Sequence, residues 1–377
     1  MIDTSILIIG AGPAGLATAA SLTREGLPTT ILERSHQIAA SWHNHYDRLH
    51  LHTDKGHSSL PGFPWPASAP RYPSREQVTE YMQDYARFFC LNIRFDQPVT
   101  HAMRVGRSWL VHSNGKQYRS KQLIVATGFN RQPYRPTWAD QDHYLGEVLH
   151  SAEYRNGQPF KGKRVLVVGF GNSGGEIAMD LHECGAQTSL AIRSANNVIP
   201  KEVFGIPFLS VGALQQWLPS GVADAVNAPL AKWLMGDMES LGLKYPDEGP
   251  LTQMRERKRI PFIDTGTIDL IRTGQITIRP GIERFVPEGV VFTDGQREPF
   301  DAVVLATGYR TGLQDWLKVG PGVLSATGEP VSSGLPIPKE PGLYFCGYHV
   351  AATGMLREIG IEAQRIASQI RQVAAMV

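Results

Sequence analysis

Cysteine is scarce in this sequence of 377 residues, since only Cys90, Cys184 and Cys346 occur and they stand far apart. That spacing excludes a CxxC redox pair and the ligand pattern of a zinc site, and it leaves no disulfide framework, which suits a reducing compartment. Long apolar runs are lacking as well: no segment approaches the roughly 18 apolar residues of a membrane span, and Ile6–Ile9 is too short for a signal peptide. We therefore expect a soluble, cytoplasmic protein with no membrane partner.

Charge of one sign is also lacking. The chain has 37 lysines and arginines against 35 aspartates and glutamates, and this formal net charge of +2 is too small to predict nucleic acid as a partner. The densest basic stretch, RERKR at Arg255–Arg259, contains Glu256, and we interpret it as a solvated surface turn. The hydrophobic content of 42% and the length fit a globular protein of about two domains.

Glycine, in contrast, is concentrated in two places where an apolar run leads into a turn and then into a helical pattern. The first is SILIIGAGPAGLATAASL, residues 5–22, and the second is VLVVGFGNSGGEIAMDL, residues 165–181. Each predicts a strand, a phosphate-binding turn and a helix, which together begin a βαβ unit. Gly26 and Gly185 stand where the two helices should end. We therefore predict the α/β class, with two nested Rossmann-like dinucleotide-binding domains.

The glycines of the first loop have separable roles: Gly10 makes the tight turn, Gly12 lets the backbone approach a pyrophosphate, and Gly15 permits close packing of helix and strand. Glu33 ends the next strand, where a carboxylate accepts hydrogen bonds from ribose hydroxyls and repels a 2′-phosphate. The first loop therefore predicts FAD or NAD, and its N-terminal GAGPAG favours FAD. The expected contacts are Gly10, Gly12, Pro13, Ala14, Gly15, Glu33 and Arg34.

The second loop has the same glycine spacing but ends its second strand in Ile-Arg-Ser rather than in an acid. A cation there pairs with a 2′-phosphate, so this loop predicts NADPH. A solvated strand-end charge is the alternative role for Arg193. The expected contacts are Gly169, Gly171, Asn172, Ser173, Gly174, Arg193 and Ser194. One loop would hold the flavin, and the other would hold the hydride donor.

Two further strands end in Ala-Thr-Gly, QLIVATGFN at 122–130 and DAVVLATGYR at 301–310, and they indicate crossovers between domains. The simplest arrangement inserts the second βαβ unit into a first domain that resumes near the end of the chain. We predict a discontinuous FAD-binding domain at 1–154 and 291–377, and an inserted NADPH-binding domain at 155–290.

Two other segments carry a structural prediction. Apolar residues at helical spacing near the end of the chain predict a closing helix on the first domain, namely Leu356, Ile359, Ile366 and Ile370. Residues 60–73 are crowded with proline and predict a loop, and their Phe63 and Trp65 indicate that this loop is ordered.

The route of the electrons is indicated by a third motif, because reduced flavin can pass electrons to a disulfide, a quinone, a metal centre or O₂. The absence of CxxC removes the disulfide route. In YLGEVLHSAEY, the residues Tyr144, Gly146, His150 and Tyr154 follow the pattern F-x-G-x-x-x-H-x-x-x-Y/F, with Tyr at the first place. The chain thus resembles class B flavin-dependent monooxygenases, and it is most similar to the YUCCA-type enzymes, through stretches such as YDRLHLH at 46–52.

The resemblance runs nearly from end to end and implies FAD and NADPH as cofactors. It implies that O₂ adds to reduced flavin as a C4a-(hydro)peroxyflavin, which transfers one oxygen atom to a small organic substrate. It places His150 at a junction between domains, with a hydrogen-bonded structural histidine as the alternative, and Trp42 near the flavin, with a core tryptophan as the alternative. The cofactor contacts also include Thr127 and Gly128, and the candidate catalytic residues are His52, His150 and Asn172.

Our first interpretation of the reaction is S- or N-oxygenation of a thioether or amine. Two alternatives stay open: YUCCA-like oxidative decarboxylation of an aromatic 2-oxo acid such as indole-3-pyruvate, and an NADPH oxidase or flavin reductase. His52 stands where amine-oxidising members commonly have Asn, which argues against trimethylamine-like substrates. The histidines of HNHYDRLHLH lack the carboxylate or cysteine context of a metal site, so we predict none. The oligomeric state stays open, with a homodimer among the candidates.

Overall fold

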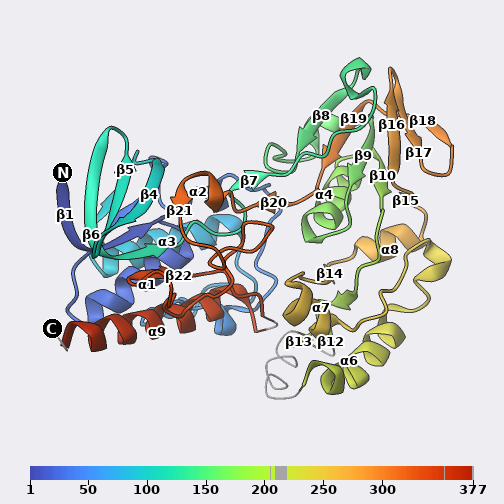
Figure 1. The fold of residues 1–377 in the computed structure, drawn as a ribbon. Coiled ribbons are helices and arrows are strands. Elements are labelled where there is room, and N and C mark those ends of the chain that lie inside the picture. The colour runs from blue at the N-terminus through green and yellow to red at the C-terminus, as the bar shows by residue number, and fades with distance from the viewer. Residues whose placement is uncertain (204, 209–218, 352, 376–377) are drawn as a thin grey trace. The chain divides into compact units, whose positions relative to one another are not determined.

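The computed structural model describes residues 1–203, 205–208, 219–351 and 353–375 (Figure 1). The chain forms two compact units. Unit 1 comprises Met1–His43, Thr53–Gln132 and Tyr309–Val377, and unit 2 comprises Asn44–His52 and Pro133–Gly308. Because the long segment of unit 2 lies between two segments of unit 1, and each unit contains a largely parallel sheet with helices, the predicted class of two nested α/β units is confirmed.

The main sheet of unit 1 has the strand order β21-β4-β5-β6-β1-β2-β3, and β22 also pairs with β6. Within it, β1 (Ile2–Ile9) lies between β2 (Thr29–Leu32) and β6 (Lys116–Val125) and runs parallel to both. Every residue of β2 is buried, as is usual for a parallel strand that is covered on both faces. Helix α1 (Pro13–Arg24) joins β1 to β2 and completes the first predicted βαβ unit.

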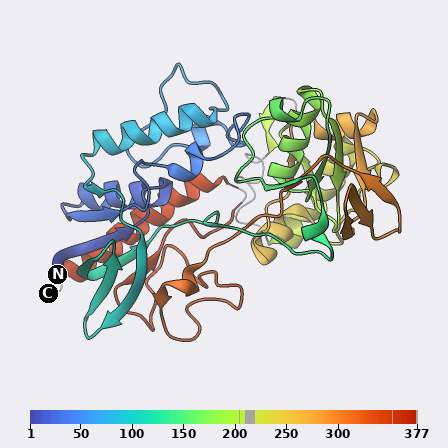
Figure 2. The ribbon, with the colours of Figure 1, turned by 90° about the horizontal axis from the view of Figure 1, so that it is seen from above.

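The closing helix of unit 1 is α9 (Met355–Ala375), which packs against α1 (Figure 2). The four apolar residues at helical spacing are buried, so this prediction is confirmed. The other elements of unit 1 are α2 (Ala40–His43), η1 (Lys55–His57), α3 (Arg75–Phe88), β3 (Ile93–Arg94), β4 (Val99–Val105), β5 (Ser108–Ser113), β20 (Tyr309–Arg310), η5 (Leu313–Asp315), β21 (Leu317–Lys318) and β22 (Leu343–Phe345). Strand β7 (Gln132–Pro133) has its first residue in unit 1 and its second in unit 2.

The proline-rich segment 60–73 is an ordered loop, as predicted. The ring of Trp65 stacks on Tyr81 of α3 at 4.1 Å between centroids, and its Nε1 donates a hydrogen bond of 3.0 Å to the carbonyl of Ser58. Phe63 packs against the rings of Tyr81 and Phe88. These contacts anchor the loop to α3 through aromatic packing rather than through a backbone ladder.

The main sheet of unit 2 is entirely parallel, with the order β15-β10-β9-β19-β8. Its centre repeats the plan of unit 1, because α4 (Asn172–Glu183) joins β9 (Arg164–Val168) to β10 (Gln187–Ala191). The sheet is completed by β8 (Glu147–His150), β15 (Ile276–Arg279) and β19 (Ala302–Leu305).

The bounds of unit 2 differ from the inserted segment 155–290 expected from the sequence. The reason is strand pairing: β19 lies between β9 and β8, and all four residues of β19 are buried. Strands β8 and β19 therefore belong to the same sheet as β9, the strand that leads into the second glycine loop.

The remaining elements of unit 2 lie outside this sheet. A three-stranded antiparallel sheet contains β16, β17 and β18, and β11 runs parallel to β14. Their bounds are η2 (Gln141–His143), η3 (Gln158–Phe160), β11 (Val198–Pro200), β12 (Glu202–Val203), β13 (Ile206–Pro207), α6 (Ser220–Met235), η4 (Glu239–Leu241), α7 (Pro250–Arg257), β14 (Phe262–Asp264), α8 (Thr267–Arg272), β16 (Ile282–Val286), β17 (Gly289–Phe292) and β18 (Arg297–Pro299).

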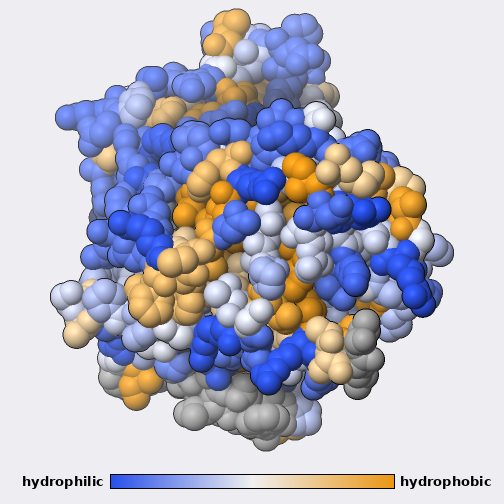
Figure 3. All heavy atoms as spheres, turned by 90° about the vertical axis from the view of Figure 1, so that its left-hand side faces the viewer, coloured by the Kyte–Doolittle hydropathy of each residue, from blue (hydrophilic) through white to orange (hydrophobic). Residues whose placement is uncertain are grey.

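The surface is mixed in character. On the face drawn in Figure 3, hydrophobic residues form several groups that are separated by hydrophilic ones. Among the helices of the described residues, none combines the length and the apolar character needed to cross a membrane.

Candidate functional site

The first glycine loop follows β1 and is shaped by backbone contacts. Gly10 has a φ of +105°, and a Cβ added there would lie 2.6 Å from the carbonyl oxygen of Ala126. A Cβ on Gly15 would lie 1.8 Å from the carbonyl oxygen of Gly10, so only glycine lets α1 start this close to the turn. A Cβ on Gly12 would meet nothing within 4 Å, which leaves this side of the loop open.

The second loop repeats these relations in unit 2. Gly169 has a φ of +114°, with an added Cβ 2.5 Å from the carbonyl oxygen of Ala306, and a Cβ on Gly174 would lie 2.0 Å from the carbonyl oxygen of Gly169. Gly171, like Gly12, has open space where a side chain would begin. Each Ala-Thr-Gly segment thus packs under the loop of its own unit.

The helices that follow the two loops have uncapped N-termini. Gly12 and Gly171 are the N-cap residues of α1 and α4, neither helix has a side-chain cap, and neither has an acid in its first turn. Helix α3 differs, because Ser74 and Gln77 form a complete capping box at its start. The first N–H groups of α1 and α4 can therefore bind an anion such as a pyrophosphate.

The strand after the first loop ends in a buried acid. Glu33 is 7% exposed, its Oε2 accepts a hydrogen bond of 2.7 Å from the backbone N–H of Ala11, and its Oε1 accepts bonds of 2.9 Å from the N–H and hydroxyl of Ser35. The carboxylate is therefore fixed against the loop, where its remaining lone pairs suit ribose hydroxyls. Arg34 is exposed beside it.

The strand after the second loop ends in an exposed cation. Arg193 and Ser194 are both exposed, and the stem of Arg193 lies 3.6 Å from the place that a Cβ on Gly281 would occupy. In the described part of the chain, Arg193 makes no ion pair with a carboxylate. The two strand ends thus differ in charge as the sequence predicts.

Three more predicted cofactor contacts lie in unit 1. The hydroxyl of Thr127 is 2.9 Å from that of the buried Tyr348, and Gly128 has a φ of +71°. Trp42 lies on α2 and is half-buried, so it is not the core tryptophan that was its alternative role.

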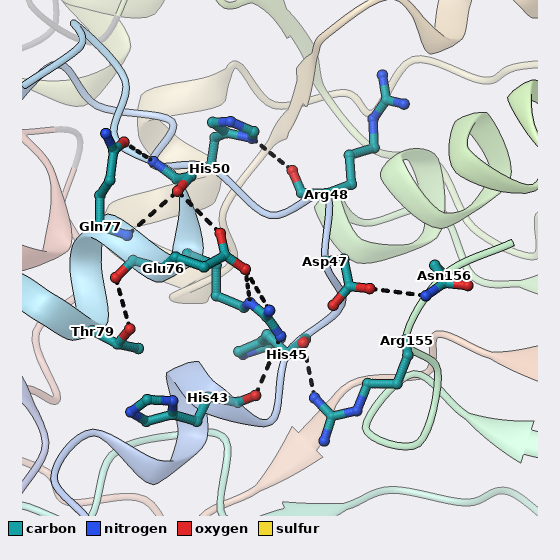
Figure 4. Close-up of polar contacts among 12 residues, drawn as sticks. His43, His45, Asp47, Arg48, His50, Glu76, Gln77, Thr79, Arg155 and Asn156 are labelled. Atoms are coloured by element: carbon teal, nitrogen blue, oxygen red, sulfur yellow. Dashed lines mark hydrogen bonds and ion pairs between the residues drawn. The ribbon is translucent and has the colours of Figure 1, made fainter. Parts of the chain in front are cut away.

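Residues 44–52 are tied to the rest of unit 2 by polar contacts, some of which Figure 4 shows. The carbonyl of His45 accepts a hydrogen bond of 3.0 Å from Arg155, and Asn156 donates one of 2.8 Å to Asp47. Arg48 forms an ion pair with Glu183 of α4. The segment that contains His52 is therefore fixed by Arg155 and Asn156 and by Glu183 of α4.

His52 itself contacts a carboxylate that the sequence analysis did not single out. Its Nε2 lies 2.6 Å from Oε1 of Glu176 on α4, and the hydroxyl of Tyr46 donates a bond of 2.7 Å to Oε2 of the same carboxylate. Glu176 is 4% exposed. Burial alone would raise the pKa of Glu176, but the neighbouring His52 and the hydrogen bonds from His52 and Tyr46 lower it below its ordinary value.

The fingerprint residues around His150 fix β8 within unit 2. The Tyr144 hydroxyl donates a bond of 2.9 Å to the carbonyl of Phe300, and a Cβ on Gly146 would lie 2.3 Å from that hydroxyl oxygen. Tyr154 is fully buried and donates a bond of 2.6 Å to Asp180 of α4. The spacing of the fingerprint is thus accounted for by packing.

His150 is fully buried, and both of its ring nitrogens meet backbone groups. Nδ1 accepts a bond of 3.1 Å from the N–H of Ala152, so Nε2 carries the proton and donates to the carbonyl of Gly308 at 3.1 Å. Burial lowers the pKa of His150, which favours this neutral form. These are the contacts of the alternative role, a hydrogen-bonded structural histidine.

Asn172, the third predicted catalytic residue, is the first residue of α4. Its Oδ1 accepts a hydrogen bond of 2.8 Å from the N–H of Ile263, which ties the start of α4 to β14. Ser173 follows it in the first turn of the helix. Among the described residues, no cluster of histidine, cysteine, aspartate and glutamate could hold a metal ion.

Comparison with known proteins places this geometry in a family. The sequence profile of the pyridine nucleotide-disulphide oxidoreductases matches residues 7–202. The flavin-containing monooxygenase of Stenotrophomonas maltophilia aligns with 99% of this chain and 100% of its own, at a TM-score of 0.74 and 25% identity. Indole-3-pyruvate monooxygenase YUCCA1 of Oryza sativa subsp. japonica is 38% identical over 352 residues, which cover 91% of this chain and 86% of that relative. The chain belongs to the YUCCA-type flavin-dependent monooxygenases.

A second YUCCA-type relative shows that the similarity is not confined to the glycine loops. Indole-3-pyruvate monooxygenase YUCCA6 of Arabidopsis thaliana is 38% identical over 384 residues, covering 98% of this chain and 90% of that relative. The family predicted from the fingerprint is therefore confirmed, and the chain is an oxidoreductase of the monooxygenase type. FAD and NADPH, which the two loops predict, agree with a YUCCA-type flavin monooxygenase.

Proposed function

We propose that this YUCCA-type monooxygenase uses NADPH, FAD and O₂ to decarboxylate an aromatic 2-oxo acid oxidatively, with indole-3-pyruvate as the first substrate to test. The observation that carries the proposal is the 38% identity, across 91% and 98% of the chain, to enzymes named for indole-3-pyruvate. This choice replaces S- or N-oxygenation as our first interpretation, since neither relative is named for it. We place the reaction in the cytoplasm, because the three cysteines are unpaired.

The proposed reaction balances without a further reactant. A 2-oxo acid, NADPH, a proton and O₂ give the carboxylic acid that is one carbon shorter, CO₂, NADP⁺ and water. The bond between the two carbonyl carbons breaks, one oxygen atom of O₂ enters the new carboxylate, and the other leaves as water. NADPH supplies the two electrons.

We propose that unit 1 holds FAD and unit 2 holds NADPH. In unit 1 the uncapped start of α1 would bind the pyrophosphate and Glu33 a ribose, while in unit 2 the start of α4 and Arg193 would bind the pyrophosphate and the 2′-phosphate. When bound, the two cofactors supply hydride transfer and the activation of O₂. Both loops fit such groups, because space is open at Gly12 and Gly171.

Of the three predicted catalytic residues, we retain only His52. Glu176, whose carboxylate is itself held by Tyr46, fixes the orientation of the His52 imidazole, which a residue near the reacting atoms requires. For His150 and Asn172 we propose positioning roles, because their side chains bond to backbone groups of unit 2.

The test follows the fate of labelled oxygen in the FAD-containing enzyme. With NADPH, ¹⁸O₂ and indole-3-pyruvate, we expect one ¹⁸O atom per molecule of indole-3-acetate and one CO₂ per NADPH consumed. Release of H₂O₂ in proportion to NADPH, whether or not the 2-oxo acid is present, would instead indicate the oxidase alternative. Labelled sulfoxide from a thioether, with no decarboxylation, would restore S-oxygenation.

A further inference from the structure

Helix α9 carries a buried carboxyl group that has no role in the site described above. Glu362 is 3% exposed and lies on the buried side of α9, the helix that packs against α1 in unit 1. We propose that Glu362 is protonated when FAD is bound, and that its ionisation as the pH rises weakens the binding of FAD. The inference rests on the proposed placement of FAD in unit 1.

The two carboxyl oxygens of Glu362 have unequal surroundings. Oε2 accepts a hydrogen bond of 2.5 Å from the backbone N–H of Gly347 and lies 2.9 Å from the hydroxyl oxygen of Ser333. Oε1 is buried and has no hydrogen-bond partner among the residues that the structure describes. A charged oxygen in such a place costs more free energy than a neutral one, because burial removes its hydration.

The contacts of Ser333 favour the neutral form of the carboxyl group. Its Oγ accepts a hydrogen bond of 3.1 Å from the N–H of Tyr348 and lies 3.3 Å from the carbonyl oxygen of Phe345. A hydroxyl has one hydrogen, so it cannot donate to Glu362 and to Phe345 at the same time. If Oε2 of Glu362 carries a proton, it donates to Ser333, and Ser333 donates to Phe345. The unpaired Oε1 is then an uncharged carbonyl oxygen.

Glu362 is linked to the first glycine loop through Gly347. This glycine has a φ of +87°, and a Cβ added to it would lie 2.9 Å from Cβ of Ala14. Ala14 is the second residue of α1, whose uncapped start would bind the pyrophosphate of FAD. A negative charge on Glu362 would therefore repel the pyrophosphate across the interior of unit 1, where charges interact more strongly than in water.

The charged groups near Glu362 come from α9 itself and from the segment after β22. Burial is the largest influence and raises the pKa of Glu362. Its hydrogen bonds and the exposed His349 lower this pKa, whereas Glu358, one turn earlier on α9, raises it. The net effect is a pKa above the ordinary value of a glutamate, which agrees with the hydrogen bonds of the neutral form.

The other segments packed here add no charge of their own. The thiol of Cys346 is fully buried near Glu362, and burial raises its pKa, so it stays neutral. The buried residues of α1, 14–22, and the loop 331–335 have no titratable side chain. The ionisation of Glu362 is therefore the change of charge that we expect in this part of the interior as the pH rises.

The test measures the dissociation constant of FAD, by dilution of the holoenzyme and flavin fluorescence, at about pH 6.5 and at about pH 9. We expect the wild type to bind FAD about tenfold more weakly at the higher pH, because ionised Glu362 repels the pyrophosphate. In Glu362→Gln the change should be less than about twofold, since the amide donates to Ser333 as the protonated acid does but cannot ionise.

Glu25→Gln is the matched control, because Glu25 of the turn after α1 pairs with Arg371 of α9 at the surface. It should keep the pH dependence of the wild type, and circular dichroism at both pH values checks that each protein stays folded. Calorimetry of FAD binding to the wild type at about pH 8, in two buffers of different ionisation enthalpy, should show proton uptake.

Three results would overturn the role of Glu362: no pH dependence in the wild type, the same dependence in Glu362→Gln, or no proton uptake when FAD binds. If the wild type binds no FAD at either pH, the proposed function fails as well. If FAD binds equally well at both pH values, only the role of Glu362 fails, so the two failures are distinguishable.

Discussion

The loop Gly10–Gly15 in unit 1 and the loop Gly169–Gly174 in unit 2 have the same backbone relations but different surroundings. In both, the first glycine packs on an Ala-Thr-Gly segment, the second faces open space, and the third lies under the carbonyl of the first. The strand end then differs: a buried carboxylate contacts the first loop, and an exposed arginine follows the second. Sterics therefore set the shape that both loops share, and we propose that the charge at the strand end distinguishes the cofactors that the two loops accept.

The helices after the loops differ as well. Ala17 in α1 and Glu176 in α4 are both two residues beyond the third glycine, and both are buried. Alanine needs no partner, whereas Glu176 requires His52 and Tyr46. Helix α4 thus provides a polar contact for residues 44–52, and helix α1 has no counterpart of this contact at Ala17.

The largest expected effect tests the shared shape. Gly15→Ala and Gly174→Ala each place a methyl group about 2 Å from a backbone oxygen, so each should lower the free energy of unfolding of its unit by more than about 4 kcal/mol. Urea denaturation of purified variants measures this loss. A stability change below about 1 kcal/mol in either variant would mean that the close approach is not required there.

The features that the sequence predicted are those that local pattern encodes. Glycine spacing gave both loops, helical periodicity gave α9, and the charge at a strand end distinguished Glu33 from Arg193. Each depends on residues that are near one another in the chain, where backbone conformation is set by sterics and hydrogen bonding.

The features that were missed depend on residues far apart in the sequence. The contact between His52 and Glu176 joins residues 124 positions apart, and Ser333 lies 29 positions from Glu362. The bounds of unit 2 were also missed, since β8 and β19 look like ordinary apolar strands until their pairing is known. For the contact between His52 and Glu176, the local signal available was a glutamate on the apolar side of the predicted helix.

The next effect concerns the residue that distinguishes the two helices. Glu176→Gln removes the buried carboxylate that contacts His52 inside unit 2 and should destabilise the protein by about 3 kcal/mol near pH 7. Because folding lowers the pKa of Glu176, its stabilisation is present above the ordinary value of 4.5 and is lost as the pH falls below 4.5 through the folded-state value.

Urea denaturation of the wild type and Glu176→Gln at about pH 7 and about pH 3.5 checks this expectation, because the difference between the two proteins should shrink at the lower pH. Glu183→Gln serves as the control, since that carboxylate is half exposed and pairs with Arg48 at the surface of α4. A difference that is equal at both pH values would mean that the charge of Glu176 does not contribute.

A smaller effect tests the charge at the two strand ends. Arg193→Ala should raise KM for NADPH by about tenfold or more, as expected for the loss of about 1.5 to 3 kcal/mol from a charged hydrogen bond, with little change in KM for NADH. Glu33→Gln should instead weaken flavin retention and leave the ratio of the two KM values unchanged, because it alters only the first loop. If KM rises equally for NADPH and NADH in Arg193→Ala, Arg193 does not bind the 2′-phosphate.

The smallest expected effect on folding, and the sharpest test of the pairing of loops with cofactors, comes from the second glycine of each loop. Gly12 and Gly171 have extended backbones, and an added methyl group meets nothing within 4 Å, so Gly12→Ala and Gly171→Ala should change stability by less than about 0.5 kcal/mol. The methyl group would nevertheless occupy the space that a pyrophosphate needs, and we expect about tenfold weaker binding of one cofactor in each variant. Flavin content should fall only in Gly12→Ala, and the affinity for NADP⁺ should fall only in Gly171→Ala. If Gly171→Ala loses flavin while Gly12→Ala keeps it, the two cofactors are assigned to the wrong units, and the opposite charges of Glu33 and Arg193 need another explanation.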